Sequence, residues 1–352
     1  MPSIQDPNTR FAVAVGAGLG ASILTILAIN RWKKRASYWN SPFLEAGRVD
    51  RLFVYPIKSC RGVEVSNVDC TLRGPRNGSM IDREFLVIDE KQDGMFLNAR
   101  IYPKMVLIEA ARLHNLLIVR LPNGKQVEVD LDEVKRRNDV REGNLYDNAR
   151  TDGLDCGDEV GQALTEFLGL EGKRSLRLIQ FSPKLYTERD PVSNQKFWLN
   201  PIPKVEDHMT FADETSYMIN TKPSIDDLNK RLESDGLKTI DIRYFRPVIS
   251  VNECELFDED RWLEVRIGDA EFICFRPCSR CVLTTVDPDE GTLSKEMQPL
   301  KKLREYRLAP KGLIGEYKQS PLFGVHLALR RPGRIRVGDT VYARYKPSPF
   351  CK

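Results

Sequence analysis

Two cysteines with cationic neighbours are the residues of this chain best suited to chemistry. Cys278 and Cys281 are separated by two residues, and Arg276 and Arg280 lie beside them in the sequence. Nearby cations favour the thiolate form of a cysteine, and a thiolate can act as a nucleophile, a redox centre or a ligand for a soft metal. The residue types alone leave these three roles open.

The surroundings of the pair weigh against two common kinds of C-x-x-C site. A zinc site would need a second ligand pair, and Cys254 and Cys274 offer only isolated partners. A thioredoxin-like dithiol would need a helix after its first cysteine, whereas the β-branched run 282–286 predicts a strand. Two buried structural cysteines would be the default for an intracellular protein. However, the two arginines and Ser279 would be costly in a core without an anion, so the stretch favours a bound anionic metal cofactor.

The composition is that of a globular protein with reduced cysteines. The 352 residues are 41% hydrophobic and 30% charged, and the net charge of +4 indicates no nucleic-acid partner. The eight cysteines have no regular spacing, which predicts free thiols in an intracellular protein. With only three histidines, a His-rich metal site or a zinc finger is not expected.

An apolar segment near the start predicts a membrane anchor. Residues 11–29 carry no charge and, as a helix, would span roughly 28 Å, close to the thickness of a hydrocarbon core. The basic residues that follow, up to Arg35, predict a single-pass anchor over 1–35 with the rest of the chain in the cytosol. A cleaved signal peptide is disfavoured because the basic cluster follows the apolar run. The moderate hydrophobicity suits the mitochondrial outer membrane, with the endoplasmic reticulum as the alternative.

Beyond the anchor the pattern predicts a mixed, β-rich fold in two modules. The first module, 46–175, has short strands and turns that suggest a small barrel or sandwich, and the second covers 185–345. A proline-containing connection up to about residue 210 separates them. The expected elements are hairpins over 85–98 and 116–131, helices over 158–169 and from Ser224 onward, and two similar Gly-Asp hairpins over 266–272 and 336–342.

Several short motifs occur in a specific order along the chain. They are Y-P-I-K-S-C at 55–60, D-R at 82–83, F-R-P at 245–247, Trp262, C-S-R-C at 278–281, T-T-V-D-P-D-E-G at 284–291, S-P-L-F-G at 320–324 and V-G-D at 337–339. In this order the chain resembles the MOSC-domain proteins that carry a leading MOSC N-terminal β-barrel domain. Together with the predicted anchor, it resembles the mitochondrial amidoxime-reducing components.

The resemblance implies a molybdenum cofactor, Mo-molybdopterin, with Cys281 as the thiolate ligand of the metal and the catalytic cysteine. Cys278 then becomes a structural neighbour. Two positions depart from the family: Val248 stands where an asparagine is common, and His326 where a tyrosine can occur. The residues at cofactor-binding positions are Lys58, Ser59, Arg83, Asp213, Thr215, Ser216, Arg246, Ser279, Arg280 and Cys281.

The resemblance also implies a reaction, the reduction of N-hydroxylated compounds such as amidoximes and hydroxylamines to amidines and amines. Electrons would come from NADH through NADH-cytochrome b5 reductase and cytochrome b5. No G-x-G-x-x-G motif follows a predicted strand, which agrees with an NADH site on a partner. The alternatives are a persulfide-carrying MOSC sulfurtransferase and a non-enzymatic molybdenum cofactor-binding protein. The sulfurtransferase would need a pyridoxal-phosphate domain, for which 352 residues leave no room, so pyridoxal phosphate is not expected.

Overall fold

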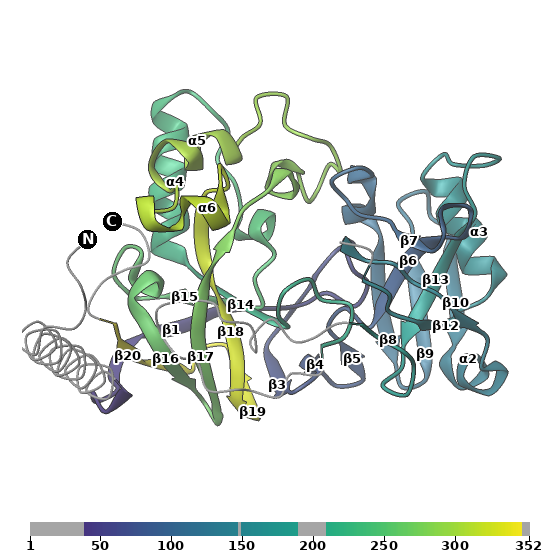
Figure 1. The fold of residues 1–352 in the computed structure, drawn as a ribbon, viewed down its shortest axis with the longest axis horizontal. Helices are drawn as coiled ribbons and strands as arrows, with labels where there is room; N and C mark the ends of the chain where they lie inside the picture. The colour runs from purple at the N-terminus through teal and green to yellow at the C-terminus, as the bar shows by residue number, and fades with distance from the viewer. Residues whose placement is uncertain (1–38, 147–148, 189–208, 347–352) are drawn as a thin grey trace, which may run out of the picture.

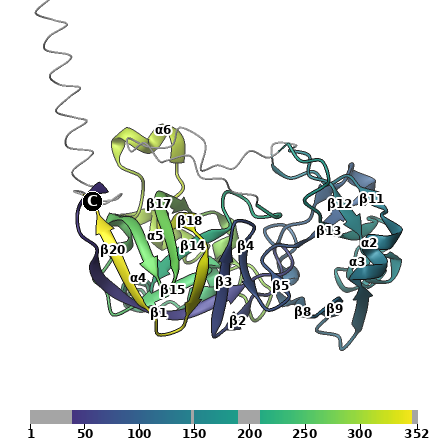
Figure 2. The ribbon, with the colours of Figure 1, turned by 90° about the horizontal axis from the view of Figure 1, so that it is seen from below.

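The computed structural model describes residues 39–146, 149–188 and 209–346, which form two β-rich units side by side (Figures 1 and 2). The predicted anchor over 1–35 lies outside the described residues. Within these ranges no helix has the length and apolar character needed to cross a membrane.

The unit that we call the first unit is a closed barrel, built mainly from residues of the second sequence module, 185–345. It is drawn mainly in green and yellow in Figure 1. It closes where β1 pairs with β15 in antiparallel register, Leu52 opposite Ile249. Inward-facing apolar side chains such as Trp262, Val265 and Leu327 fill its core. In sheet order the strands are β15 (Ile249–Asn252), β14 (Tyr217–Thr221), β18 (Leu322–Arg331), β17 (Ala270–Ser279), β16 (Trp262–Ile267), β20 (Thr340–Tyr345), β1 (Leu44–Val54) and the edge strand β2 (Val63–Val65).

The second unit, drawn in blue and teal, packs two antiparallel sheets and two helices around a separate core. Phe85, Leu117 and Leu164 belong to this core, and they come from one sheet, the other sheet and a helix. One sheet has the order β11 (Val140–Arg141), β12 (Gly153–Asp155), β13 (Leu176–Phe181), β6 (Phe85–Asp89), β7 (Met95–Phe96), and the other β10 (Gln126–Asp130), β9 (Leu116–Arg120), β8 (Glu109–Leu113). The helices are α2 (Leu131–Arg137) and α3 (Asp158–Phe167).

A small sheet and a set of short helices complete the fold. Strand β19, late in the chain, pairs with β3 and so links distant parts of the sequence. Helices α4 and α5 share an apolar cluster with Phe245 and Phe323 beside the barrel. The sheet has the order β19 (Gly333–Arg336), β3 (Asn67–Thr71), β4 (Gly74–Asn77), β5 (Met80–Ile81). The α-helices are α4 (Lys222–Ser234), α5 (Leu300–Tyr306) and α6 (Ile314–Tyr317), and the 3₁₀ helices are η1 (Glu90–Gln92), η2 (Pro103–Leu107), η5 (Ile242–Phe245), η6 (Asp258–Arg261), η7 (Val282–Thr285) and η8 (Lys311–Leu313).

Most local predictions are confirmed, and two are wrong. The pairings β6–β7, β9–β10 and β16–β17 are the expected hairpins, and α3 and α4 are the expected helices, although α4 begins at Lys222, two residues before the predicted start at Ser224. The hairpin predicted over 336–342 does not form, because β19 pairs with β3 whereas β20 pairs with β16 and β1.

The strand predicted over 282–286 is also wrong, because this segment forms the 3₁₀ helix η7. The Thr284 hydroxyl donates to the Cys281 carbonyl at 2.9 Å, and the Thr285 hydroxyl donates to the Val282 carbonyl at 2.8 Å. These local bonds satisfy backbone groups without a neighbouring strand, so they outweigh the β-propensity of the run.

Candidate functional site

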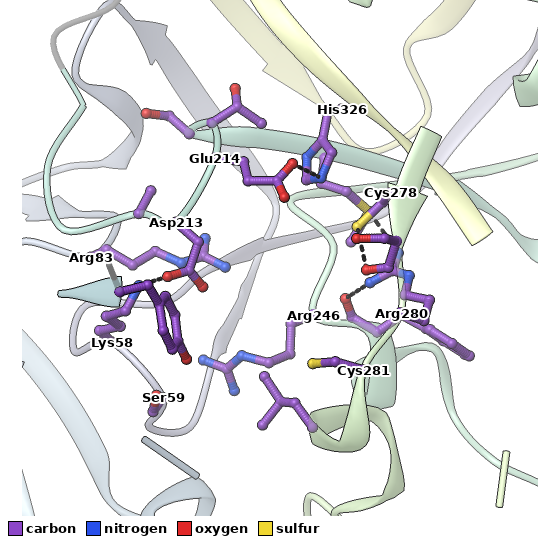
Figure 3. Close-up of a pocket in the computed structure, with 18 of the residues that line it drawn as sticks. Lys58, Ser59, Arg83, Asp213, Glu214, Arg246, Cys278, Arg280, Cys281 and His326 are labelled. Carbon is purple, nitrogen blue, oxygen red and sulfur yellow. Dashed lines mark hydrogen bonds and ion pairs between the residues drawn. The ribbon is translucent and has the colours of Figure 1, made fainter. Parts of the chain in front are cut away.

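A cavity of about 660 Å³ lies at the junction of the two units and gathers the candidate residues (Figure 3). Arg100, Tyr146 and Glu188 of the second unit contribute to its lining. Every residue that the sequence placed at a cofactor position lines this one cavity: Lys58, Ser59, Arg83, Asp213, Thr215, Ser216, Arg246, Ser279, Arg280 and Cys281.

The two cysteines of the C-x-x-C pair have different environments. Cys281 is exposed, whereas Cys278 is buried, and burial raises the pKa of Cys278 to about 11. Strand β17 ends at Ser279, and Cys281 then caps η7, where its carbonyl accepts from the Thr284 N–H at 3.0 Å. The accessible thiol is therefore that of Cys281, and Cys278 stays a neutral packing residue.

Two arginines from distant segments share one aromatic platform. The guanidinium carbons of Arg83 and Arg246 lie 4.5 and 4.3 Å from the ring centroid of Tyr55. The Tyr55 hydroxyl donates to the Pro247 carbonyl at 3.1 Å, and its backbone N–H donates to Asp82 at 2.8 Å. Sequence reasoning placed Tyr55 in a motif but did not name it as a site residue. The contact joins residues nearly 200 positions apart, so no local signal reveals it.

Arg83 and Arg246 differ in how their charges are compensated. Arg83 forms an ion pair with the buried carboxylate of Asp82. In contrast, Nη2 of Arg246 is buried and has no hydrogen-bond partner among the described residues, and burial lowers the Arg246 pKa. A guanidinium keeps its charge in proteins, so this buried donor calls for an acceptor from a ligand.

The backbone at three of these positions is in the left-handed region. The φ angles are 68° at Ser59, 46° at Arg83 and 53° at Arg246. Non-glycine residues adopt this conformation at a cost of about 1–3 kcal/mol, and such residues cluster at functional sites. Next to Ser59, the buried ammonium of Lys58 donates to the Phe211 carbonyl at 2.8 Å and pairs with Asp213. These segments thus hold cations at the cavity wall.

The guanidinium of Arg280 has a structural role within the protein. Its Nε donates to the Phe323 carbonyl at 2.7 Å, Nη1 to the Phe245 carbonyl at 2.9 Å, and Nη2 to Asn220 at 3.1 Å. All three nitrogens are engaged, so this side chain joins β14, β18 and η5 and offers the cavity mainly its positive charge.

Two hydroxyl side chains, and Val248 at the position where asparagine is common in the family, also line the cavity. The Thr215 hydroxyl donates to the Leu327 carbonyl at 2.7 Å, whereas the buried Ser216 hydroxyl has no hydrogen-bond partner in the described part of the chain. Val248 is buried and lines the cavity, so this position presents an apolar surface.

One acidic and imidazole-containing cluster was not among the predicted site residues. Nη1 of Arg276 lies 3.0 Å from Oε2 of Glu214. Nε2 of His326 lies 3.2 Å from the same oxygen, and Figure 3 shows Glu214 beside His326. All three residues line the cavity. Arg276 and His326 face each other on β17 and β18, so the strand pairing sets their geometry. Among the described residues there is no group of three or more His, Cys, Asp or Glu that could hold a metal by itself.

Comparison with known proteins places the chain in a family. The MOSC N-terminal beta barrel domain matches residues 46–171, and the MOSC domain matches residues 206–342. The chain is 36% identical to mitochondrial amidoxime reducing component 2 of Homo sapiens, with 96% of this chain and 94% of that protein aligned. The Homo sapiens component 1 is 34% identical over 92% of each chain, and the Danio rerio component 1 is 32% identical over 97% and 96%. This chain belongs to the MOSC family of the amidoxime-reducing components.

The MOSC domain is a molybdenum-cofactor-binding type of domain, and the cavity can be tested against that chemistry. A pterin cofactor with a phosphate group needs cations, polar donors and enough room. The MOSC cavity provides about 660 Å³, the buried unpartnered donor of Arg246 and the cations Lys58 and Arg83. Its exposed thiol, Cys281, offers a soft ligand for the metal. The residues present therefore fit the group.

Proposed function

We propose that this protein is a molybdenum-dependent reductase of N-hydroxylated compounds, such as amidoximes and hydroxylamines. The observation that carries the proposal is the exposed Cys281 thiol, which lies in the same cavity as the buried, unpartnered guanidinium donor of Arg246. A soft metal ligand and an anion-binding group in one cavity suit an anionic metal cofactor. When bound, that cofactor supplies two-electron reduction of an N–O bond.

The residues of the chain divide the work of holding the cofactor. Cys281 would be the protein ligand of the metal, and Arg246, Arg83 and Lys58 would hold the phosphate and the polar edges of the pterin. Tyr55 is a positioning residue, because it keeps the two guanidinium groups at one wall.

Electrons would reach the site from NADH through NADH-cytochrome b5 reductase and cytochrome b5. The relatives carry "mitochondrial" in their names, and the predicted anchor would place the protein in the mitochondrial outer membrane with its catalytic part in the cytosol, or alternatively in the endoplasmic reticulum membrane. Anchoring would raise the local concentration of membrane-bound donors. Fractionation of cells that express the full chain tests this location.

Metal analysis combined with a paired substitution tests the function. The purified protein should contain molybdenum and pterin, and with the donor chain it should reduce an aromatic amidoxime to the amidine. Cys281→Ala should lose the reduction, whereas the matched Cys278→Ala should keep most of it because that thiol only packs. Zinc in place of molybdenum, or full activity in Cys281→Ala, would contradict the proposal.

The exposure of Cys281 also favours one competing function, persulfide carriage by a MOSC sulfurtransferase. A persulfide releases thiocyanate when it is treated with cyanide. If the purified protein yields thiocyanate in proportion to Cys281 and contains no molybdenum, sulfur transfer replaces the reductase proposal.

A further inference from the structure

Glu214 and His326 form an acid–imidazole pair in the cavity that cofactor binding does not use. Oε2 of Glu214 lies 3.2 Å from Nε2 of His326 and 3.0 Å from Nη1 of Arg276. These contacts are within ion-pair distance but are not hydrogen bonds, because the buried Oε2 has no hydrogen-bond partner among the described residues. In Figure 3 the carboxyl group points toward the imidazole ring. The three side chains come from the segment before β14, from β18 and from β17, so the barrel itself fixes their arrangement.

The surroundings keep the imidazole of His326 neutral. Nδ1 is buried and has no hydrogen-bond partner among the described residues, so an imidazolium there would bury an unsatisfied N–H. Burial lowers the pKa of His326 well below its ordinary value, and the charges of Arg276, Arg280 and Arg83 lower it further. The pair therefore consists of a neutral imidazole and a carboxyl group, and the carboxyl group is the member that exchanges a proton.

Glu214 is suited to carry that proton. Its side chain is 33% exposed, so it can exchange with water. Burial raises the pKa of Glu214, Arg276 opposes the rise, and the nearby charges of Asp213 and Glu316 add to it. The neighbouring Asp213, by contrast, is 53% exposed and forms an ion pair with Lys58.

The acid lies on the side of the cavity that carries the C-S-R-C stretch. Arg276, which Glu214 contacts at 3.0 Å, and Cys278 lie two residues apart on β17, and both line the cavity together with Cys281. Cys278 is three residues before Cys281, the proposed metal ligand. A proton held on Glu214 is therefore near the place where the substrate oxygen would leave.

We propose that Glu214 donates a proton to the leaving oxygen of the substrate, with His326 as the positioning residue that holds its carboxyl group. This inference rests on the proposed reductase function. Reduction of R–NH–OH to R–NH₂ and water takes two electrons, delivered through the bound cofactor from a one-electron donor protein, and two protons. The O–H bond of Glu214 breaks, the N–O bond breaks, and a new O–H bond forms on the departing water. Solvent supplies the other proton and re-protonates Glu214.

Glu316 provides a matched control for the substitution. Like Glu214 it contacts Arg276, at 3.4 Å, and is 33% exposed, but in the described part of the chain no ion pair or hydrogen bond joins it to His326. Glu214→Gln should lower kcat roughly 100-fold or more at the acidic end of the pH profile, where the carboxyl group of the wild type holds its proton, since general acids contribute about 10²–10⁴ in rate. It should also remove the decline of kcat on the alkaline side, with the molybdenum content unchanged. Glu316→Gln should keep kcat within about threefold and keep the decline, and Glu214→Asp should retain part of the rate and the decline.

A second readout needs no bound cofactor. The chain has three histidines, so ¹⁵N-imidazole NMR of histidine-labelled protein can be assigned with a His326→Phe variant. His326 should remain neutral to well below pH 6, and its Nε2 signal should follow the titration of Glu214. That response should vanish in Glu214→Gln and persist in Glu316→Gln.

The outcomes separate this inference from the function on which it rests. A wild-type kcat and pH profile in Glu214→Gln, or a His326 that titrates like an exposed histidine, overturns the proton role and leaves the reductase proposal intact. A molybdenum-loaded wild-type protein that reduces no N-hydroxylated compound overturns the reductase proposal, and the proton role falls with it. If Glu214→Gln does not fold, the Glu214→Asp pH profile and the wild-type His326 titration decide the matter.

Discussion

Two cavity arginines, Arg246 and Arg280, should respond differently when each is replaced by methionine. One replacement should lower the stability of the fold, and the other should weaken cofactor binding. Arg280 donates to two buried carbonyls and to Asn220, all within 3.1 Å. Arg246 has a buried nitrogen without a hydrogen-bond partner among the described residues, and its guanidinium packs on the ring of Tyr55. Arg280→Met should therefore destabilise the fold, whereas Arg246→Met should mainly weaken cofactor binding.

The magnitudes follow from the groups that each change leaves behind. Arg280→Met leaves three buried acceptors without their donor. A buried unsatisfied group costs about 1–3 kcal/mol, and breaking a buried charged network typically costs about 3–5 kcal/mol in total, because the parts do not add fully. Arg246→Met loses a cation–π contact of about 0.5–2 kcal/mol but also removes a charge whose burial lowers its pKa. The net change in unfolding free energy for Arg246→Met should stay within about 1 kcal/mol.

Urea unfolding followed by circular dichroism measures the first quantity, and molybdenum content measures the second. With a denaturant slope of about 3 kcal/mol per molar, a loss of about 4 kcal/mol moves the midpoint of Arg280→Met down by roughly 1.3 M. Arg246→Met should keep its midpoint within about 0.3 M while its molybdenum content falls. Equal midpoints for the two variants would refute the distinction between a structural and a ligand-holding arginine.

Three further outcomes are expected. In cofactor-free protein, iodoacetamide should label Cys281 before the other described cysteines, since it alone among them is exposed. Mass spectrometry of tryptic peptides after short exposure measures this, and earlier labelling of a buried thiol would contradict the structure. Burial raises the pKa of Glu259 to about 7, so its stabilising contribution is lost as pH rises from the ordinary glutamate range through 7; Glu259→Gln should flatten the fall in urea midpoint between pH 5 and 8. Gly324 has a φ of 78°, and an added Cβ would lie 2.5 Å from the side-chain amide nitrogen of Asn220. Gly324→Ala should therefore lower the free energy of unfolding by at least about 2 kcal/mol. An unchanged midpoint in thermal or urea unfolding would disprove the close approach.

The sequence predicted most local elements and ten of the residues that line the cavity, but it missed Glu214, Arg276 and His326 and did not predict how the cavity residues contact one another. Alternating patterns and turn residues predict hairpins such as β9–β10 because neighbouring residues decide them. Ordered motifs identified residues that line one cavity, since family membership carries tertiary information. The engagement of Arg280 and the platform of Tyr55 depend on segments far apart in the chain, which periodicity does not report. The strand prediction over 282–286 was wrong because two threonine hydroxyls donate hydrogen bonds to nearby backbone carbonyls.

The T-T-V-D-P-D-E-G motif shows why residues without reactive groups can still define such a site. Within it, Asp289 accepts two hydrogen bonds from Arg243 at 2.8 and 2.7 Å, and Asp287 accepts from the Tyr244 hydroxyl at 2.8 Å. Asp287 also accepts from the backbone N–H of Asp289 at 2.9 Å, which fixes the turn itself. The motif is thereby tied to η5, the short helix that contains Arg243 and Tyr244.

These contacts between the motif and η5 set the distance between Arg246 and Cys281 in the cavity. Arg246 follows η5 directly, and Cys281 precedes η7, whose end leads into the motif. A bidentate pair between guanidinium and carboxylate fixes orientation as well as separation. The acids of the motif therefore hold Arg246 and Cys281 at a constant spacing, as the proposed cofactor, with a phosphate at one end and a metal at the other, would require. Motif order carries this information because the spacing is set by packing rather than by any single reactive residue.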